Sequence, residues 1–137
     1  MMKTPFVTKE QLDAITAQYP TPFHIYDEAG IRENARRLRE AFSWNPGYRE
    51  YFAVKATPTP AILKILKEEG CGCDCSSLTE LLMSEKCGIT DENIMFSSND
   101  TPAEEFQLAV NLDANINLDV LTLVLSLEQS IPHIPHQ

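Results

Sequence analysis

Basic residues, long hydrophobic runs and an export signal are scarce or missing in this sequence of 137 residues. Eleven Lys and Arg stand against 20 Asp and Glu, which gives a formal net charge of −9. An acidic chain without a basic stripe binds a phosphate backbone poorly, so we expect no nucleic-acid partner. No apolar run approaches the roughly 20 residues that span a bilayer, so we expect no membrane segment. The first eleven residues lack the apolar core of a secretion signal, which predicts a cytoplasmic protein.

The composition is that of one folded domain. Hydrophobic residues make up 43% of the chain and charged residues 23%. This apolar fraction is too high for a disordered protein. A chain of this length can bury about 68–70% of its unfolded surface. We therefore expect a folded protein whose partners are small molecules or another protein chain.

The four cysteines lie close together in the sequence, at Cys71, Cys73, Cys75 and Cys87. Metal-binding pairs are usually separated by two to four residues on a turn, whereas alternate residues share one face of a strand. In a reducing cytoplasm the default state of cysteine is the free thiol. We therefore predict that these side chains are small buried hydrophobic groups and that the chain has no metal site.

Helix and strand signals alternate along the chain, which indicates an α/β fold. Capping signatures at Thr8, Asp27 and Ser77 predict helix starts. The helices are expected at about 8–18, 28–42, 61–69, 78–87 and from 102 onwards. The strands are expected at 23–26, 51–56, 72–76, 93–98 and 115–119.

The last four strands, each followed by a helix or an apolar run, predict parallel β/α units. They fit the N-terminal part of a TIM-type (β/α)8 barrel, which needs about 250 residues to close. An open α/β layer of four or five strands is the alternative. We divide the chain into an N-terminal helix and strand (1–27), a partial barrel (28–119) and an atypical tail (120–137). The tail is apolar at first and then ends in Pro and His residues that predict no element.

Reactive residues of β/α proteins lie at the carboxyl ends of strands. Lys55 closes the first of these strands, and shielding by Phe52 and Val54 would suit an amine nucleophile. A solvated lysine at a strand edge is the alternative that the residues alone leave open.

Carboxyl and amide groups occupy comparable positions on the later strands. Asp74 lies inside a strand of small residues, where a carboxylate is costly unless it is paired, so it is a candidate partner for a cation. Glu80 is either the third residue of a helix-capping box or a direct ligand. Asn99 and Asp119 end strands and are more typical of turns and helix caps than of sites.

Four segments resemble one family of enzymes: Ala53–Ala56, Pro58–Leu66, Gly72–Leu81 and Ile116–Asp119. They are similar to the pyridoxal-phosphate-dependent decarboxylases of the alanine-racemase-like fold. These enzymes act on diaminopimelate, ornithine, arginine or carboxynorspermidine. The opening segment Thr21–Asp27 fits as well, and the whole run is most similar to diaminopimelate decarboxylase.

The resemblance implies a site and a reaction. It implies that Lys55 is the lysine that binds the aldehyde of pyridoxal 5'-phosphate, and that Asp74 and Glu80 lie beside it. The implied activity is decarboxylation of meso-2,6-diaminopimelate to L-lysine and CO2, in an amino-acid biosynthetic pathway. The full-length family is implied to be homodimeric.

The resemblance implies that the family pattern is incomplete in this chain. The histidine that stacks on the cofactor, the glycine-rich phosphate loop and the acidic partner of the pyridine nitrogen would all follow residue 137. None of His24, His133 and His136 fits the stacking position. We therefore expect a truncated decarboxylase whose own activity is uncertain. An inactive fragment that associates with a homologue, or a decarboxylase for another amino acid of this group, is the alternative.

Overall fold

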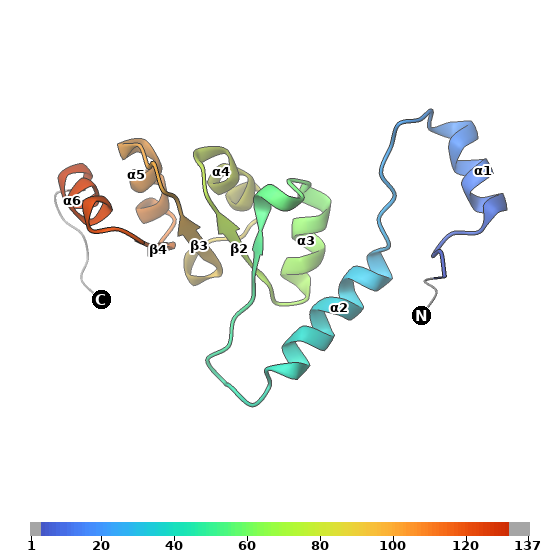
Figure 1. Ribbon diagram of the computed structural model, residues 1–137, viewed down its shortest axis with the longest axis horizontal. Coiled ribbons are helices and arrows are strands. Elements are labelled where there is room, and N and C mark those ends of the chain that lie inside the picture. Colours follow the sequence, from blue (N-terminus) through green and yellow to red (C-terminus); the bar gives the residue numbers. More distant parts are fainter. Residues whose placement is uncertain (1–3, 132–137) are drawn as a thin grey trace.

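The computed structural model describes residues 4–131 (Figure 1). Its helices are α1 (Lys9–Gln18), α2 (Glu28–Ala41), α3 (Pro60–Glu68), α4 (Leu78–Lys86), α5 (Ala103–Asn111) and α6 (Leu121–Ser130). Its strands are β1 (Tyr51–Ala53), β2 (Gly72–Cys75), β3 (Ile94–Ser97) and β4 (Asn115–Asn117). Two short 3-10 helices are η1 (Val54–Ala56) and η2 (Asp91–Asn93).

The four strands form one parallel sheet in the order β1-β2-β3-β4. Each strand therefore pairs with the next one along the chain, and the order never reverses. In a doubly wound sheet the strand order reverses at one point, whereas in a β/α barrel each strand lies beside the next one in the sequence. The prediction of about four β/α units in the N-terminal part of a barrel is confirmed.

Within residues 4–131, helices cover only one face of this sheet. Cys73 and Cys75 on β2, with Ile94 and Phe96 on β3, are buried in a core that α4, α5 and α6 complete. Figure 1 shows α3 to α6 side by side in chain order along the sheet, and neighbouring helices are in contact. All four cysteines are buried free thiols, so the prediction that they act as small hydrophobic groups is confirmed.

The opposite face of the sheet is polar and incompletely covered. Register places Ala53, Asp74 and Met95 side by side, and it pairs Ser97 with Asn117. Asp74 and Ser97 are half-buried and Asn117 is exposed, in contrast to the buried residues that alternate with them on β2 and β3. In a closed barrel this face lines the interior.

A hydrogen-bonded cluster crosses the amino-terminal ends of the strands on this face. The Tyr51 hydroxyl on β1 donates to the Glu92 carbonyl at 2.7 Å, and the Asn115 amide on β4 donates to the same carbonyl at 3.1 Å. The Tyr51 ring reaches this carbonyl by lying against Gly72 of β2. A Cβ atom at Gly72 would come within 2.8 Å of the ring carbon Cδ1. The missing side chain of Gly72 thus leaves room for the ring.

Helices α2 and α3 are joined by an arginine cluster around one buried carboxylate. Glu69, which is 6% exposed, accepts hydrogen bonds from Arg36 at 2.6 and 2.7 Å and from Arg32 at 3.1 Å. Arg39 donates to the Glu69 carbonyl at 2.7 Å. The hydrogen bonds from Arg36, opposed by burial, hold the pKa of Glu69 at about 2.

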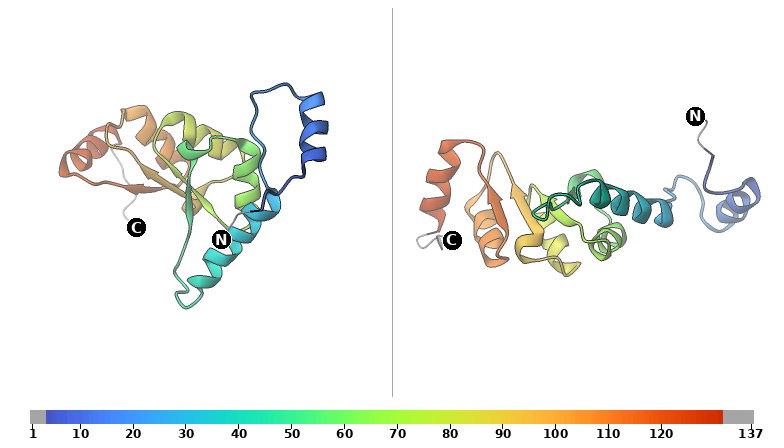
Figure 2. Two further views of the ribbon diagram at one scale, coloured as in Figure 1. Left: turned by 45° about the vertical axis from the view of Figure 1, so that its right-hand side comes forward. Right: turned by 90° about the horizontal axis from the view of Figure 1, so that it is seen from below.

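The N-terminal segment confirms two predicted caps and corrects one predicted strand. Thr8 and Gln11 form the reciprocal capping box of α1, and Asp27 accepts from the Gly30 N–H at 3.1 Å. The predicted strand at 23–26 was wrong. The segment is extended, but it runs from α1 to α2 away from the sheet and has no neighbouring strand to pair with (Figure 2).

The predicted tail contains a helix that the sequence analysis did not expect. Leu123 and Leu127 of α6 are buried in the core with Ile131, and α6 contacts α5. The four-residue spacing of these side chains places them on one helical face. The apolar run after Asp119 therefore continues the layer of helices. His133 and His136 lie outside the described residues.

Candidate active site

Lys55 lies on η1, directly after β1, rather than on the strand itself. The predicted strand 51–56 is shorter than expected because the backbone turns at Val54. The turn buries Val54 completely and leaves Lys55 exposed. Lys55 is thus an accessible amine at the carboxyl end of a parallel strand, without the apolar shielding that the sequence suggested.

Asp74 lies on the open face of β2, in the strand next to β1. Burial raises the pKa of the Asp74 carboxyl, and the nearby charge of Lys55 only partly offsets this effect. The charge of Glu80 acts in the raising direction. The charges of Lys55 and Glu80 are therefore both close enough to influence the ionisation of the Asp74 carboxyl.

Glu80 is bonded to the start of its own helix. Its carboxylate accepts from the Ser76 N–H at 2.8 Å and from the Ser76 hydroxyl at 3.2 Å. The Ser77 hydroxyl accepts from the Glu80 N–H at 3.4 Å. In a standard capping box the carboxylate would accept from the N–H of the cap residue Ser77, whereas here the donor is Ser76, one residue earlier. Glu80 thus orders the turn between Asp74 and α4.

The N-terminus of α4 carries a second carboxylate from the neighbouring helix. Glu105 of α5 accepts from the Leu78 N–H at 2.9 Å. Helix N-termini of α/β proteins often hold phosphate groups on such free N–H groups. Here the carboxylates of Glu80 and Glu105 occupy that environment, so α4 offers no favourable place for a phosphate.

Asn99 and Asp119 do not join this cluster. Both are exposed, and the caps of the helices that follow them are Pro102 and Val120. Ser97, by contrast, was not singled out from the sequence although it lies on the same face of the sheet as Asp74. Its position next to Phe96, at the end of the predicted strand 93–98, was the sequence signal that could have placed it on the opposite face from Phe96.

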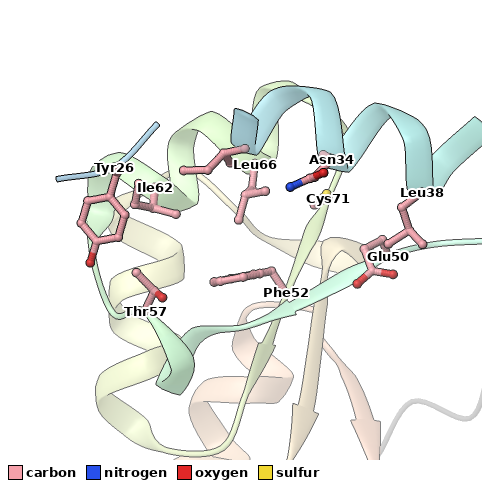
Figure 3. A pocket seen from close by; sticks show the side chains of 11 residues that line it. Tyr26, Asn34, Leu38, Glu50, Phe52, Thr57, Ile62, Leu66 and Cys71 are labelled. Carbon is pink, nitrogen blue, oxygen red and sulfur yellow. The ribbon is translucent and has the colours of Figure 1, made fainter. Parts of the chain in front are cut away.

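A cavity of about 340 Å³ lies elsewhere, between α2, β1 and α3. Figure 3 shows Phe52, Ile62 and Leu66 projecting into it. Its lining includes none of Lys55, Asp74 and Glu80. The cavity is on the helix-covered side of the sheet, so it is separate from the candidate site.

A family model supports the resemblance seen in the sequence. The model for the pyridoxal-binding domain of pyridoxal-dependent decarboxylases matches residues 28–136. This chain belongs to that family. The match includes the segment after Asp119, where the sequence analysis expected the family pattern to end.

Individual relatives agree with this assignment. The chain is 48% identical over 108 residues to Protein TabA of Pseudomonas amygdali pv. tabaci, covering 79% of this chain and 26% of TabA. It is 34% identical over 116 residues to diaminopimelate decarboxylase of Methanothermobacter thermautotrophicus, covering 84% of this chain and 27% of that enzyme. The chain thus spans about a quarter of the length of these curated relatives.

A solved structure confirms the fold. The crystal structure of SrLDC in complex with PLP and cadaverine matches with a TM-score of 0.82 at 21% identity. The match covers 96% of this chain and 34% of SrLDC. The family domain is pyridoxal-binding, so pyridoxal phosphate is the cofactor of the family to which this chain belongs.

The residues of the candidate site fit one end of this cofactor. An accessible amine at Lys55 can react with an aldehyde, and the Asp74 carboxylate, close enough to feel the charge of Lys55, can attract a cationic group. The phosphate end does not fit at the N-terminus of α4, because Glu80 and Glu105 would repel it. The described residues thus suit the aldehyde end of pyridoxal phosphate but not its phosphate end.

No helix among residues 4–131 combines the length and apolar character needed to cross a membrane.

Proposed function

We propose that this chain carries the cofactor-attachment part of a pyridoxal-phosphate-dependent amino-acid decarboxylase. Diaminopimelate decarboxylases match it at 34% identity, which supports meso-2,6-diaminopimelate as substrate and L-lysine and CO2 as products. The observation that carries the proposal is the exposed Lys55 beside Asp74 at the carboxyl end of a barrel strand, in a chain that belongs to this family.

Each residue of the site has a distinct task in this proposal. Lys55 supplies the amine that attaches the cofactor. Asp74 provides a negative charge that attracts the lysine. Glu80 holds the turn after β2 through Ser76 and so fixes the position of Asp74. When bound, the cofactor supplies an electron sink for the bond that releases CO2.

The identity to TabA, at 48%, exceeds the identity to the diaminopimelate decarboxylases. This observation favours a second candidate function, in which the same machinery acts on a different amino acid. The two candidates share Lys55 and the cofactor and differ only in substrate.

Trapping of the cofactor on a single lysine tests the proposal. We expect borohydride treatment of the purified chain with pyridoxal phosphate to label Lys55, as located by peptide mapping. Lys55→Ala should abolish this label, whereas Lys64→Ala, which removes an exposed lysine of α3, should leave it intact. Label spread over the surface lysines, or a label that survives Lys55→Ala, would contradict the proposal.

Release of CO2 separates the two candidate substrates. The chain would be supplied with meso-2,6-diaminopimelate, ornithine, arginine or carboxynorspermidine at equal concentration. Preference for diaminopimelate supports the first candidate, and preference for another amino acid supports the second. Activity that persists in Lys55→Ala would contradict both, because each requires that lysine.

A further inference from the structure

A connection of only two residues leads from β2, the strand that carries Asp74, into α4. Strand β2 ends at Cys75 and α4 begins at Leu78, so Ser76 and Ser77 alone join them. Asp74 lies two positions before Ser76 in the chain. The candidate site is at the carboxyl ends of the strands. Side chains that hold this connection therefore also hold the end of β2 at the site.

Two carboxylates hold the connection, and they come from different helices. Glu80 belongs to α4 itself and accepts from the Ser76 N–H at 2.8 Å, across four positions of the chain. Glu105 belongs to α5 and accepts from the Leu78 N–H at 2.9 Å, across 27 positions. The bond of Glu80 thus closes a local turn. The bond of Glu105 ties the start of α4 to the next β/α unit.

The core fixes the backbone that carries Glu105. Phe106, the next residue of α5, is completely buried and packs edge-on against Phe96 of β3, with ring centroids 6.4 Å apart. The Glu105 N–H donates to the Pro102 carbonyl at 3.0 Å, and its side chain is half-buried. A carboxylate that accepts from an N–H at a helix N-terminus makes a charge-assisted bond, which is stronger than a neutral one. Glu105 is therefore a firm support for the first turn of α4.

The adjacent residue Glu104 gives a matched comparison. Both carboxylates lie in the first turn of α5, so both interact with the dipole of that helix. Glu104 is exposed, and of the two only Glu105 donates an acceptor oxygen to α4 within residues 4–131. The difference between the two residues is therefore the bond to Leu78.

We propose that Glu105 is a positioning residue for the candidate site, which holds the connection between β2 and α4 through its bond to Leu78. Its importance for the reaction rests on the proposed function of Lys55 and Asp74. The positioning itself is a property of the polypeptide without cofactor. The sequence analysis named Glu80 and not Glu105, because the partner of Glu105 lies in a different β/α unit.

Amide hydrogen exchange of the full chain, measured by NMR without cofactor, tests the positioning. We expect Glu105→Ala to speed exchange of the Leu78 N–H by about tenfold, as follows from loss of a bond to a charged acceptor. Exchange of the Ser76 N–H should also become faster, because the connection loosens as a unit. Glu105→Gln keeps an acceptor oxygen at the same chain length and should restore most of the protection at both amides. Glu104→Ala should leave both unchanged.

Three results would overturn the proposal. The first is equal exchange at Leu78 and Ser76 in Glu105→Ala and Glu104→Ala. The second is a change confined to Leu78, which would make Glu105 a helix cap that does not hold the connection. The third is a Glu105→Gln variant that behaves like Glu105→Ala while the amides of β2 and β3 keep their native protection.

A second readout connects Glu105 to the cofactor. The rate at which borohydride traps pyridoxal phosphate on Lys55 would be measured against cofactor concentration. We expect Glu105→Ala to raise the half-saturating concentration severalfold without changing the maximal rate, because Lys55 lies on η1 and not on the connection. Glu104→Ala should change neither quantity. Equal losses in both quantities for Glu105→Ala would refute the positioning role.

The two measurements separate this proposal from the proposed function. An unmodified chain in which Lys55 is not trapped would contradict the proposed function. The exchange measurement uses no cofactor, so it decides the role of Glu105 in either case.

Discussion

Replacement of Gly72 by alanine tests whether the Tyr51 ring needs the space above β2. The new Cβ atom would lie 2.8 Å from Tyr51 Cδ1 and 3.0 Å from Cε1, and closer still to the Asn93 carbonyl oxygen. An ordinary contact of this kind is about 3.5–4.0 Å, so the ring must move by roughly 1 Å. The Asn93 oxygen belongs to the backbone directly before β3, so it cannot swing aside as a flexible side chain can.

The cost of this substitution can be worked from its parts. Overpacking costs about 1–3 kcal/mol, and loss of the hydrogen bond from Tyr51 to the Glu92 carbonyl costs about 1 kcal/mol more. Alanine also lowers the conformational entropy of the unfolded chain, and this effect offsets about 0.4–1 kcal/mol of the total cost. The expected net destabilisation is therefore about 2 kcal/mol.

Urea unfolding followed by circular dichroism provides the assay. With a denaturant slope of about 2 kcal/mol per molar urea, the midpoint of Gly72→Ala should fall by about 1 M. The control is Gly47→Ala, because a Cβ atom there meets only the Asn45 amide oxygen, at 3.5 Å. Equal midpoints for the two variants would refute the reasoning about the Tyr51 ring.

Two further predictions concern the arginine cluster and the last helix. The pKa of Glu69 lies at about 2 in the folded chain, below its ordinary 4.5, so its carboxylate stabilises the fold above about pH 4.5 and loses this effect as the pH falls toward 2. The gap in thermal midpoint between the unmodified chain and Glu69→Gln should therefore be full at pH 6 and close near pH 2; a gap that is constant with pH would contradict this. Leu123→Ala should destabilise the chain by about 2–4 kcal/mol in urea, whereas Leu125→Ala, at a position that is 58% exposed, should change stability by less than about 0.5 kcal/mol. Equal effects would show that α6 does not pack as described.

The sequence by itself determined the local elements and the chemistry of single residues. Four of the five strands expected from the sequence are present, and the capping residues Thr8, Asp27 and Ser77 located helix starts to within a residue. These signals depend on neighbours a few positions away, so they can be read from the chain alone. The same is true of the segments around Lys55 and Asp74 that indicated the family.

Only the tertiary structure decided which of these segments pair with a strand or pack against a helix. The segment 23–26 has strand-like residues but no adjacent strand, whereas the apolar run of α6 became a helix because α5 offered a surface for Leu123 and Leu127. The exposure of Lys55 depends on a turn, and the placement of Asp74 and Ser97 on one face of the sheet depends on the register between separate strands. Such contacts join residues far apart in the chain, and local sequence patterns do not specify them.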